Sequence, residues 1–257
     1  IAFVFSSIFF LSFYGTFLAY KLVKKERYGA EDVAVLLSNA FIFYALGYNT
    51  LVESDAYDDD TGLFTIINAA IHFGISQLIR SRLADRALYY LVFGLTIVFI
   101  TIAIPVQFDG NWVTLLWIAE AVLMFLIGRT KGVAAYEKLS GVLLLLDVFS
   151  MGEDWLSYGD QFVYGNENIS PFANITFASG LLVAAAVGYM LWLSRNRKYL
   201  SAIPAENFFR SYFPYIIAVF FFLVSYLVFF FEIQAYFSQV PVQATNPDAS
   251  WSAGVID

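Results

Sequence analysis

Apolar residues along this chain gather into long runs separated by short polar segments. A helix needs about 20 predominantly apolar residues to cross the hydrocarbon core of a bilayer. Eight runs approach that length: roughly residues 1–20, 31–52, 62–79, 87–105, 112–128, 139–151, 172–193 and 211–233. The sixth run is short, so it must span thinly or continue into the segment that follows it. The pattern predicts an all-α fold, a polytopic transmembrane helical bundle of about eight spans.

The charged residues of the polar segments divide between the two sides of this predicted bundle. All 14 Lys and Arg residues follow odd-numbered runs: Lys21, Lys24, Lys25, Arg27, Arg80, Arg82, Arg86, Arg129, Lys131, Lys138, Arg195, Arg197, Lys198 and Arg210. By the positive-inside rule these connections are cytoplasmic, so both termini are predicted on the non-cytoplasmic side. The alternate connections hold acidic residues, among them Asp58, Asp109 and Asp154. This acidic bias is either a topology and solvation signal or a vestibule that attracts cations.

The composition agrees with a membrane environment. Hydrophobic residues make up 60% of the chain and charged residues 14%, whereas soluble domains have about 45–50% and about 25%. A basic nucleic-acid-binding patch is absent, and the chain has no Cys, which excludes disulfides and thiolate chemistry. The chain begins inside an apolar run without an initiator Met. We therefore predict that residues 1–257 form a single transmembrane helical domain that is part of a longer chain.

Three ionisable residues lie within the predicted spans, where each is costly unless it is paired or hydrated. They are His72, Glu120 and Asp147. Counting along the helices, Glu120 is roughly 12 Å and His72 roughly 15 Å below the outer boundary. A contact between His72 and Glu120 is therefore possible if the third and fifth spans are neighbours. Asp147 is expected about four residues from the outer end of the sixth span, roughly 6 Å deep.

Further polar residues extend this pattern. Thr65, Asn68, His72 and Ser76 follow one another at helical spacing and share one face, and Trp117 lies one turn before Glu120. Such a stripe should face the bundle interior or a water-filled cavity. We interpret these groups either as an outward-open polar pocket or as a hydrogen-bond network that holds the helices together.

A row of small residues on the seventh run, Gly180, Ala184 and Gly188, predicts close packing against another helix. Motifs for phosphate binding, serine hydrolysis, zinc binding and dithiol chemistry are absent. The single His excludes coordination of a metal or haem by several His residues. No cofactor is predicted.

The segment from Gly110 through Trp112 and Trp117 to Glu120 resembles the G-x-W-x-x-x-x-W-x-x-E signature of a bacterial family of predicted multi-span membrane proteins, domain of unknown function 2339. Asn39-Ala40 and Gly47-Tyr48 are similar to that family's N-A…G-Y segment. Members tend to be longer and to have more spans. The resemblance implies a protein of the bacterial cytoplasmic (inner) membrane. It also implies that Gly110, Trp112, Trp117 and Glu120 belong to the family's characteristic segment. It implies no activity.

Three functions remain open. The first is transport or binding of a cation, a proton or a small polar envelope ligand in an outward-facing pocket, with Glu120 as the charged group, His72 as its titrating partner, and Asp147, Asn68 and Trp117 nearby. The second is a structural or assembly subunit of a membrane complex. The third, which we rank lower, is an enzyme acting on a lipid-linked or envelope substrate through Asp147, Glu153, Asp154 and Trp155. Expected partners are membrane lipid and other membrane subunits or further spans of the same chain, and nucleic acid is not expected.

Overall fold

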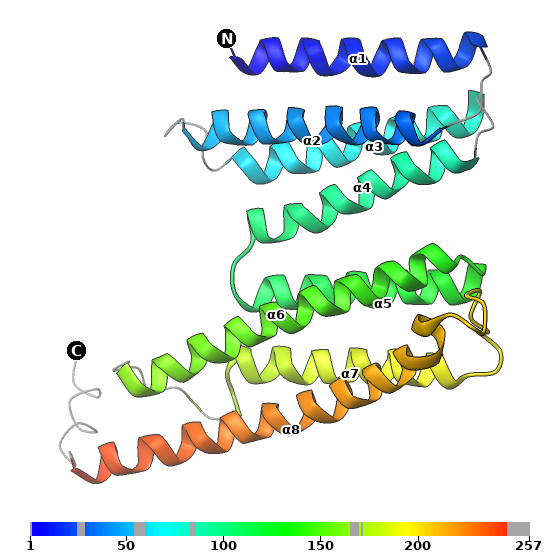
Figure 1. Ribbon diagram of the computed structural model, residues 1–257. Coiled ribbons are helices and arrows are strands. Elements are labelled where there is room, and N and C mark those ends of the chain that lie inside the picture. Colours follow the sequence, from blue (N-terminus) through cyan, green and yellow to red (C-terminus); the bar gives the residue numbers. More distant parts are fainter. Residues whose placement is uncertain are drawn as a thin grey trace. The chain divides into compact units, whose positions relative to one another are not determined.

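A computed structural model describes residues 2–24, 29–53, 60–82, 86–164, 170 and 172–245 (Figure 1). In these ranges every regular element is helical. The helices are α1 (Ala2–Lys24), α2 (Ala30–Val52), α3 (Thr61–Arg82), α4 (Arg86–Gln107), α5 (Asn111–Lys131), α6 (Ala134–Tyr164), α7 (Ile175–Arg195) and α8 (Phe208–Thr245). The all-α prediction is confirmed, and each helix coincides with one of the eight apolar runs.

Six of these helices are long and apolar enough to cross a membrane: α2, α3, α4, α5, α7 and α8. Large apolar side chains on their surfaces are exposed, including Phe222 at 68% and Trp192 at 55%. Contiguous apolar surface of this kind suits a lipid environment and is rare on soluble monomers. The chain is therefore an integral membrane protein. The count of eight spans and the side of the termini stay predictions.

The contacts divide the chain into two compact units, residues 1–108 and 109–257, each described here by itself. The first unit holds α1 to α4, in which α3 packs most extensively on α4 and α2 contacts both α1 and α3. Its core is rich in aromatic rings, for example Phe10 stacked on Phe43 with centroids 4.4 Å apart. Gly47 lies so close to the ring of Phe64 that a Cβ there would overlap it. A single transmembrane domain stays a prediction.

The second unit is a four-helix arrangement of α5 to α8. Here α5 packs on α6 and α7, and α8 packs on α6 and α7. The small residues of α7 face α8: a Cβ on Gly180 would lie 2.5 Å from Val228, and one on Gly188 would lie 3.0 Å from Phe221. The predicted packing role is confirmed for Gly180 and Gly188, because only small side chains let the two backbones approach so closely.

The sixth run differs from its expected length. Helix α6 has 31 residues and ends at Tyr164. Of the two alternatives given above, a thin span or a continuation into the following segment, the structure shows the continuation. Glu153 and Asp154 are therefore helical rather than part of a loop. The physical reason is that Ser150, Asp154 and Tyr158 continue the inward face of α6 and bond to neighbouring helices. Our placement of Asp147 four residues from the helix end was wrong.

Candidate functional site

His72 of α3 is fully buried in the first unit. Its Nδ1 lies 3.1 Å from the hydroxyl of Tyr14 on α1. The imidazole is stacked on Phe99 of α4, with ring centroids 5.1 Å apart and planes within 3°. His72 therefore joins three helices through one hydrogen bond and ring contacts, while its Nε2 has no hydrogen-bond partner among the described residues.

The polar stripe of α3 faces the interior, as predicted, since Thr65, Asn68 and Ser76 are all buried. Thr65 Oγ1 lies 3.1 Å from the hydroxyl of Tyr44 on α2. Asn68 donates to the carbonyl of Phe64, 2.8 Å away, but its Oδ1 has no hydrogen-bond partner in the described part of the chain. The bonds of His72 to Tyr14 and of Thr65 to Tyr44 join α3 to α1 and α2, which supports the network interpretation. The bonds of Asn68 and Ser76 stay within α3.

Asp147 of α6 is the most exceptional polar residue of the second unit. Its side chain is 0% exposed, and neither carboxyl oxygen has a hydrogen-bond partner among the residues that the structure describes. Burial of an isolated carboxylate without a partner is strongly unfavourable. A charged Asp147 would therefore need a compensating partner, whereas protonation would remove the charge itself.

One turn beyond Asp147 on the same face of α6 begins a chain of hydroxyl groups. Ser150 Oγ lies 2.7 Å from Thr114 Oγ1 of α5, and Thr114 Oγ1 donates to Asp154 Oδ2 at 2.6 Å. Because Thr114 has only one hydroxyl proton, Ser150 must donate to Thr114 whenever Thr114 donates to Asp154. Asp154 is half-buried and its neighbour Glu153 is exposed. The chain thus leads from Ser150 toward the surface at the acidic end of the unit.

Glu232 of α8, which is not among the residues singled out from the sequence, is another buried carboxylate, 1% exposed. Its Oε1 accepts from the Tyr158 hydroxyl at 2.7 Å and from Asn174 Nδ2 at 2.9 Å. Its Oε2 accepts from the backbone N–H of Phe172 at 2.7 Å. Asn174 also caps α7 by accepting from Phe177 N–H. Glu232 directly follows three Phe residues in an apolar run. An acidic residue at such a position is the feature of the sequence that could have identified it.

A third buried carboxylate, Glu137, lies near the start of α6. It is 1% exposed and forms an ion pair with Arg129, with an Nε to Oε2 distance of 3.3 Å. Ser201 Oγ donates to Oε2 at 2.7 Å and Ala202 N–H to Oε1 at 3.0 Å. Gly132, with a φ of +66°, ends α5 with left-handed geometry and allows the tight turn that brings Arg129 and Glu137 together. From the sequence, Arg129 was interpreted only as a topology signal.

The residues of the family-like segment lie at the start of α5. Gly110 precedes the helix with a φ of +55°, a conformation that favours glycine. Trp112 is 59% exposed, and Trp117 and Glu120 are half-buried. Glu120 thus belongs to the second unit and His72 to the first, and a contact between them stays a prediction.

The carboxylates considered for an enzyme do not form a common open site. Asp147 is fully buried, Asp154 is half-buried, and Glu153 is exposed. Trp155 packs on Phe231, with ring centroids 5.3 Å apart. Among the described residues, no three acidic or His side chains are close enough to hold a metal ion.

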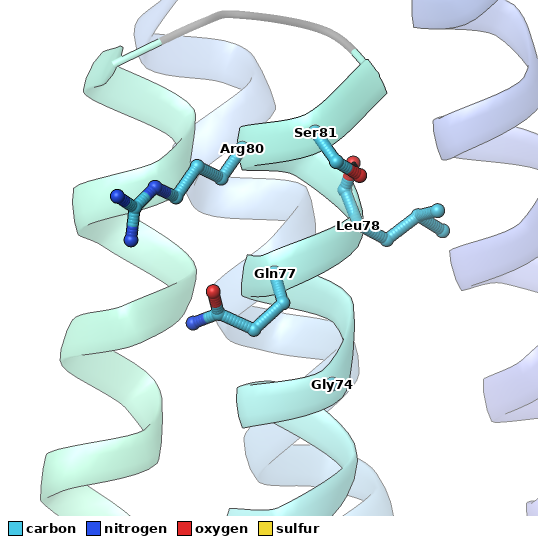
Figure 2. A pocket seen from close by; sticks show the side chains of 5 residues that line it. All are labelled: Gly74, Gln77, Leu78, Arg80 and Ser81. Carbon is cyan, nitrogen blue, oxygen red and sulfur yellow. Dashed lines mark hydrogen bonds between the residues drawn. The ribbon is translucent and has the colours of Figure 1, made fainter.

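Surface hollows lie away from these polar groups. One, of about 650 Å³, is lined by Gly74, Gln77, Leu78, Arg80 and Ser81 near the end of α3. Figure 2 shows Gln77 and Arg80 directed to the same side of the helix, and the Arg80 guanidinium lies 6.0 Å from the ring of Tyr89 on α4. The hollow is open and contains none of the predicted site residues.

Comparisons with protein-family models, curated proteins and solved structures found no match. The resemblance to domain of unknown function 2339 stays a prediction, and the second unit must be interpreted from its own geometry.

Proposed function

We propose that this protein binds, and moves across the membrane, a proton or a small cation, and that Asp147 is the binding group. The observation that carries this proposal is the burial of both Asp147 oxygens without a hydrogen-bond partner among the described residues. Ionisable residues held at such cost within membrane domains typically serve ion and proton pathways.

The hydroxyl chain supplies a route to Asp147. Asp154 lies at the end of the second unit that the charge pattern assigns to the non-cytoplasmic side, where acidic residues concentrate positive ions. Thr114 and Ser150 connect Asp154 to the turn next to Asp147. A protonated Asp154 can donate its proton to Thr114 while Thr114 donates its own hydroxyl proton to Ser150, so each hydroxyl group on the route receives one proton and passes one on. Residues three apart on a helix are neighbours, so Ser150 is next to Asp147 on α6. Neither Asp147 oxygen accepts a bond from Ser150 in this structure, so the Ser150 hydroxyl must rotate toward Asp147 before it can pass the proton on.

The proposal includes the predicted topology and location of the protein. The protein has eight spans with both termini on the non-cytoplasmic side, lies in a bacterial cytoplasmic membrane, and is related to domain of unknown function 2339. Glu120, His72, Asn68 and Trp117 are then secondary polar groups. Asp147, Ser150, Thr114 and Asp154 all lie within the second unit, so the proposed site does not require a contact between His72 and Glu120.

The test is ion flux into liposomes that contain the purified protein and a pH-sensitive dye, with and without a Na⁺ gradient. We expect flux from the native protein and none from Asp147→Asn, which keeps the shape and removes the charge. Thr114→Val should slow proton flux severalfold without abolishing it. Glu153→Gln, an exposed acidic neighbour on the same helix, is the matched control and should keep native flux. Native flux in Asp147→Asn would refute the proposal.

A role as an assembly subunit is the second candidate. Glu232 favours it, because its three bonds tie α6, α7 and α8 together with both oxygens occupied. A network of this kind stabilises a helical scaffold and needs no ligand. Copurification of a stoichiometric partner, together with absence of flux, would favour this function.

A further inference from the structure

A long apolar groove runs between α6 and α8 in the second unit. Its volume is about 900 Å³. Gly141 lies at its floor, where a Cβ would come within 2.6 Å of Phe209. Leu145 and Val219 line its open side and are 55% and 67% exposed. Since the chain is an integral membrane protein, an exposed apolar groove on its surface opens to lipid.

The groove has a charge at one end. Lys138, in the first turns of α6, is exposed and lines the groove together with Tyr212 and Tyr215 of α8. It is the charged member of the lining, and it belongs to the side of the chain that carries all the basic residues. Tyr and Lys together are typical of the level of the lipid headgroups.

The length of the groove matches one leaflet. From Lys138 to Val148 along α6 is ten residues, or roughly 15 Å of helix, about half the ~30 Å hydrocarbon thickness. We propose that this groove binds an anionic phospholipid of the leaflet on the basic side. One acyl chain lies along α6 and α8, and the phosphate contacts the ammonium group of Lys138.

A second groove, which has no charged residue in its lining, provides a comparison. It lies between α1 and α2 in the first unit, has a volume of about 690 Å³, and is also mainly apolar. Its lining residues, which include Phe9, Asn39 and Ile42, are all uncharged. A hydrocarbon chain fits either groove equally well on these grounds. Only the groove between α6 and α8 offers a cation that distinguishes lipids by headgroup charge.

The experiment is native mass spectrometry of the full chain taken from membranes with equal amounts of phosphatidylglycerol and phosphatidylcholine that carry the same acyl chains. We expect about fivefold preferential retention of phosphatidylglycerol, the effect of a single basic residue near the lipid surface. Lys138→Gln should bring retention close to parity. Leu145→Trp should fill the groove and reduce retention of both lipids.

Two matched controls decide the outcome. Lys131→Gln removes an exposed basic residue at the same end of the unit, and Leu123→Trp enlarges a residue of α5 that is 50% exposed and outside the groove. Both should retain lipid as the native protein does. The proposal is overturned if the native protein shows no preference, if Lys131→Gln removes the preference as fully as Lys138→Gln, or if Leu145→Trp retains lipid normally.

Discussion

Asp147 and Glu232 are buried carboxylates of the same four-helix unit, yet their surroundings are opposite. Glu232 accepts three hydrogen bonds, two from side chains and one from the backbone. Asp147 accepts none among the described residues. A buried charge that is fully hydrogen-bonded fixes the structure around it, whereas one without partners destabilises that structure unless something binds it. On the function proposed above, what distinguishes the functional carboxylate is burial without protein partners, and not burial alone.

The first way to test this comparison is to remove the carboxylate with the strongest partners. Glu137→Ala leaves Arg129 buried without its counter-charge and leaves the Ser201 hydroxyl and Ala202 N–H without an acceptor. We expect the free energy of unfolding to fall by about 4 kcal/mol. Unfolding in detergent micelles by titration with a denaturing detergent measures this loss. Glu153→Ala on the exposed side of α6 is the control and should change stability by less than about 0.5 kcal/mol. A loss for Glu137→Ala no larger than the control's would contradict the account.

The second test removes Glu232. Glu232→Ala leaves three donors without an acceptor, those of Tyr158, Phe172 and Asn174, in the place where α6, α7 and α8 meet. Each buried donor that loses its partner costs about 1–3 kcal/mol, and partial access of water to Phe172 and Asn174 reduces the sum. We therefore expect a loss of about 3 kcal/mol, measured in the same unfolding assay. The exposed Glu206→Ala is the matched control. A stable Glu232→Ala protein would show that the three bonds are dispensable.

The positions of the helices could be predicted because apolar length is a direct consequence of bilayer thickness. The packing row Gly180, Ala184 and Gly188 was predictable for a similar reason, since small side chains at helical spacing have one main use in a membrane bundle. The inward face of α3 also followed from spacing alone. In each case the residues on which the prediction depends all lie on one helix.

The buried carboxylates were harder, because their role depends on which helices meet. Lipid and protein interior are both apolar, so the sequence of a span gives little information on its partner. Asp147 was identified from its place in an apolar run, but its lack of partners depends on the helices packed against α6 as much as on α6 itself. Glu137 and Arg129 lie near helix ends in basic segments, where solvation is the simpler interpretation. The extension of α6 depends on Thr114 and Glu232, which lie on other helices.

The most direct measurement of the central claim is the stability of Asp147→Asn beside that of the native protein in the same detergent. The substitution removes the charge and adds an amide of similar shape, so no protein hydrogen bond described here is lost. We expect a free energy of unfolding equal to the native value or higher by up to about 1 kcal/mol, because the amide is neutral in the buried site without binding a proton or a cation. A fall of about 3 kcal/mol, as expected for Glu232→Ala, would make Asp147 a structural residue and contradict the account.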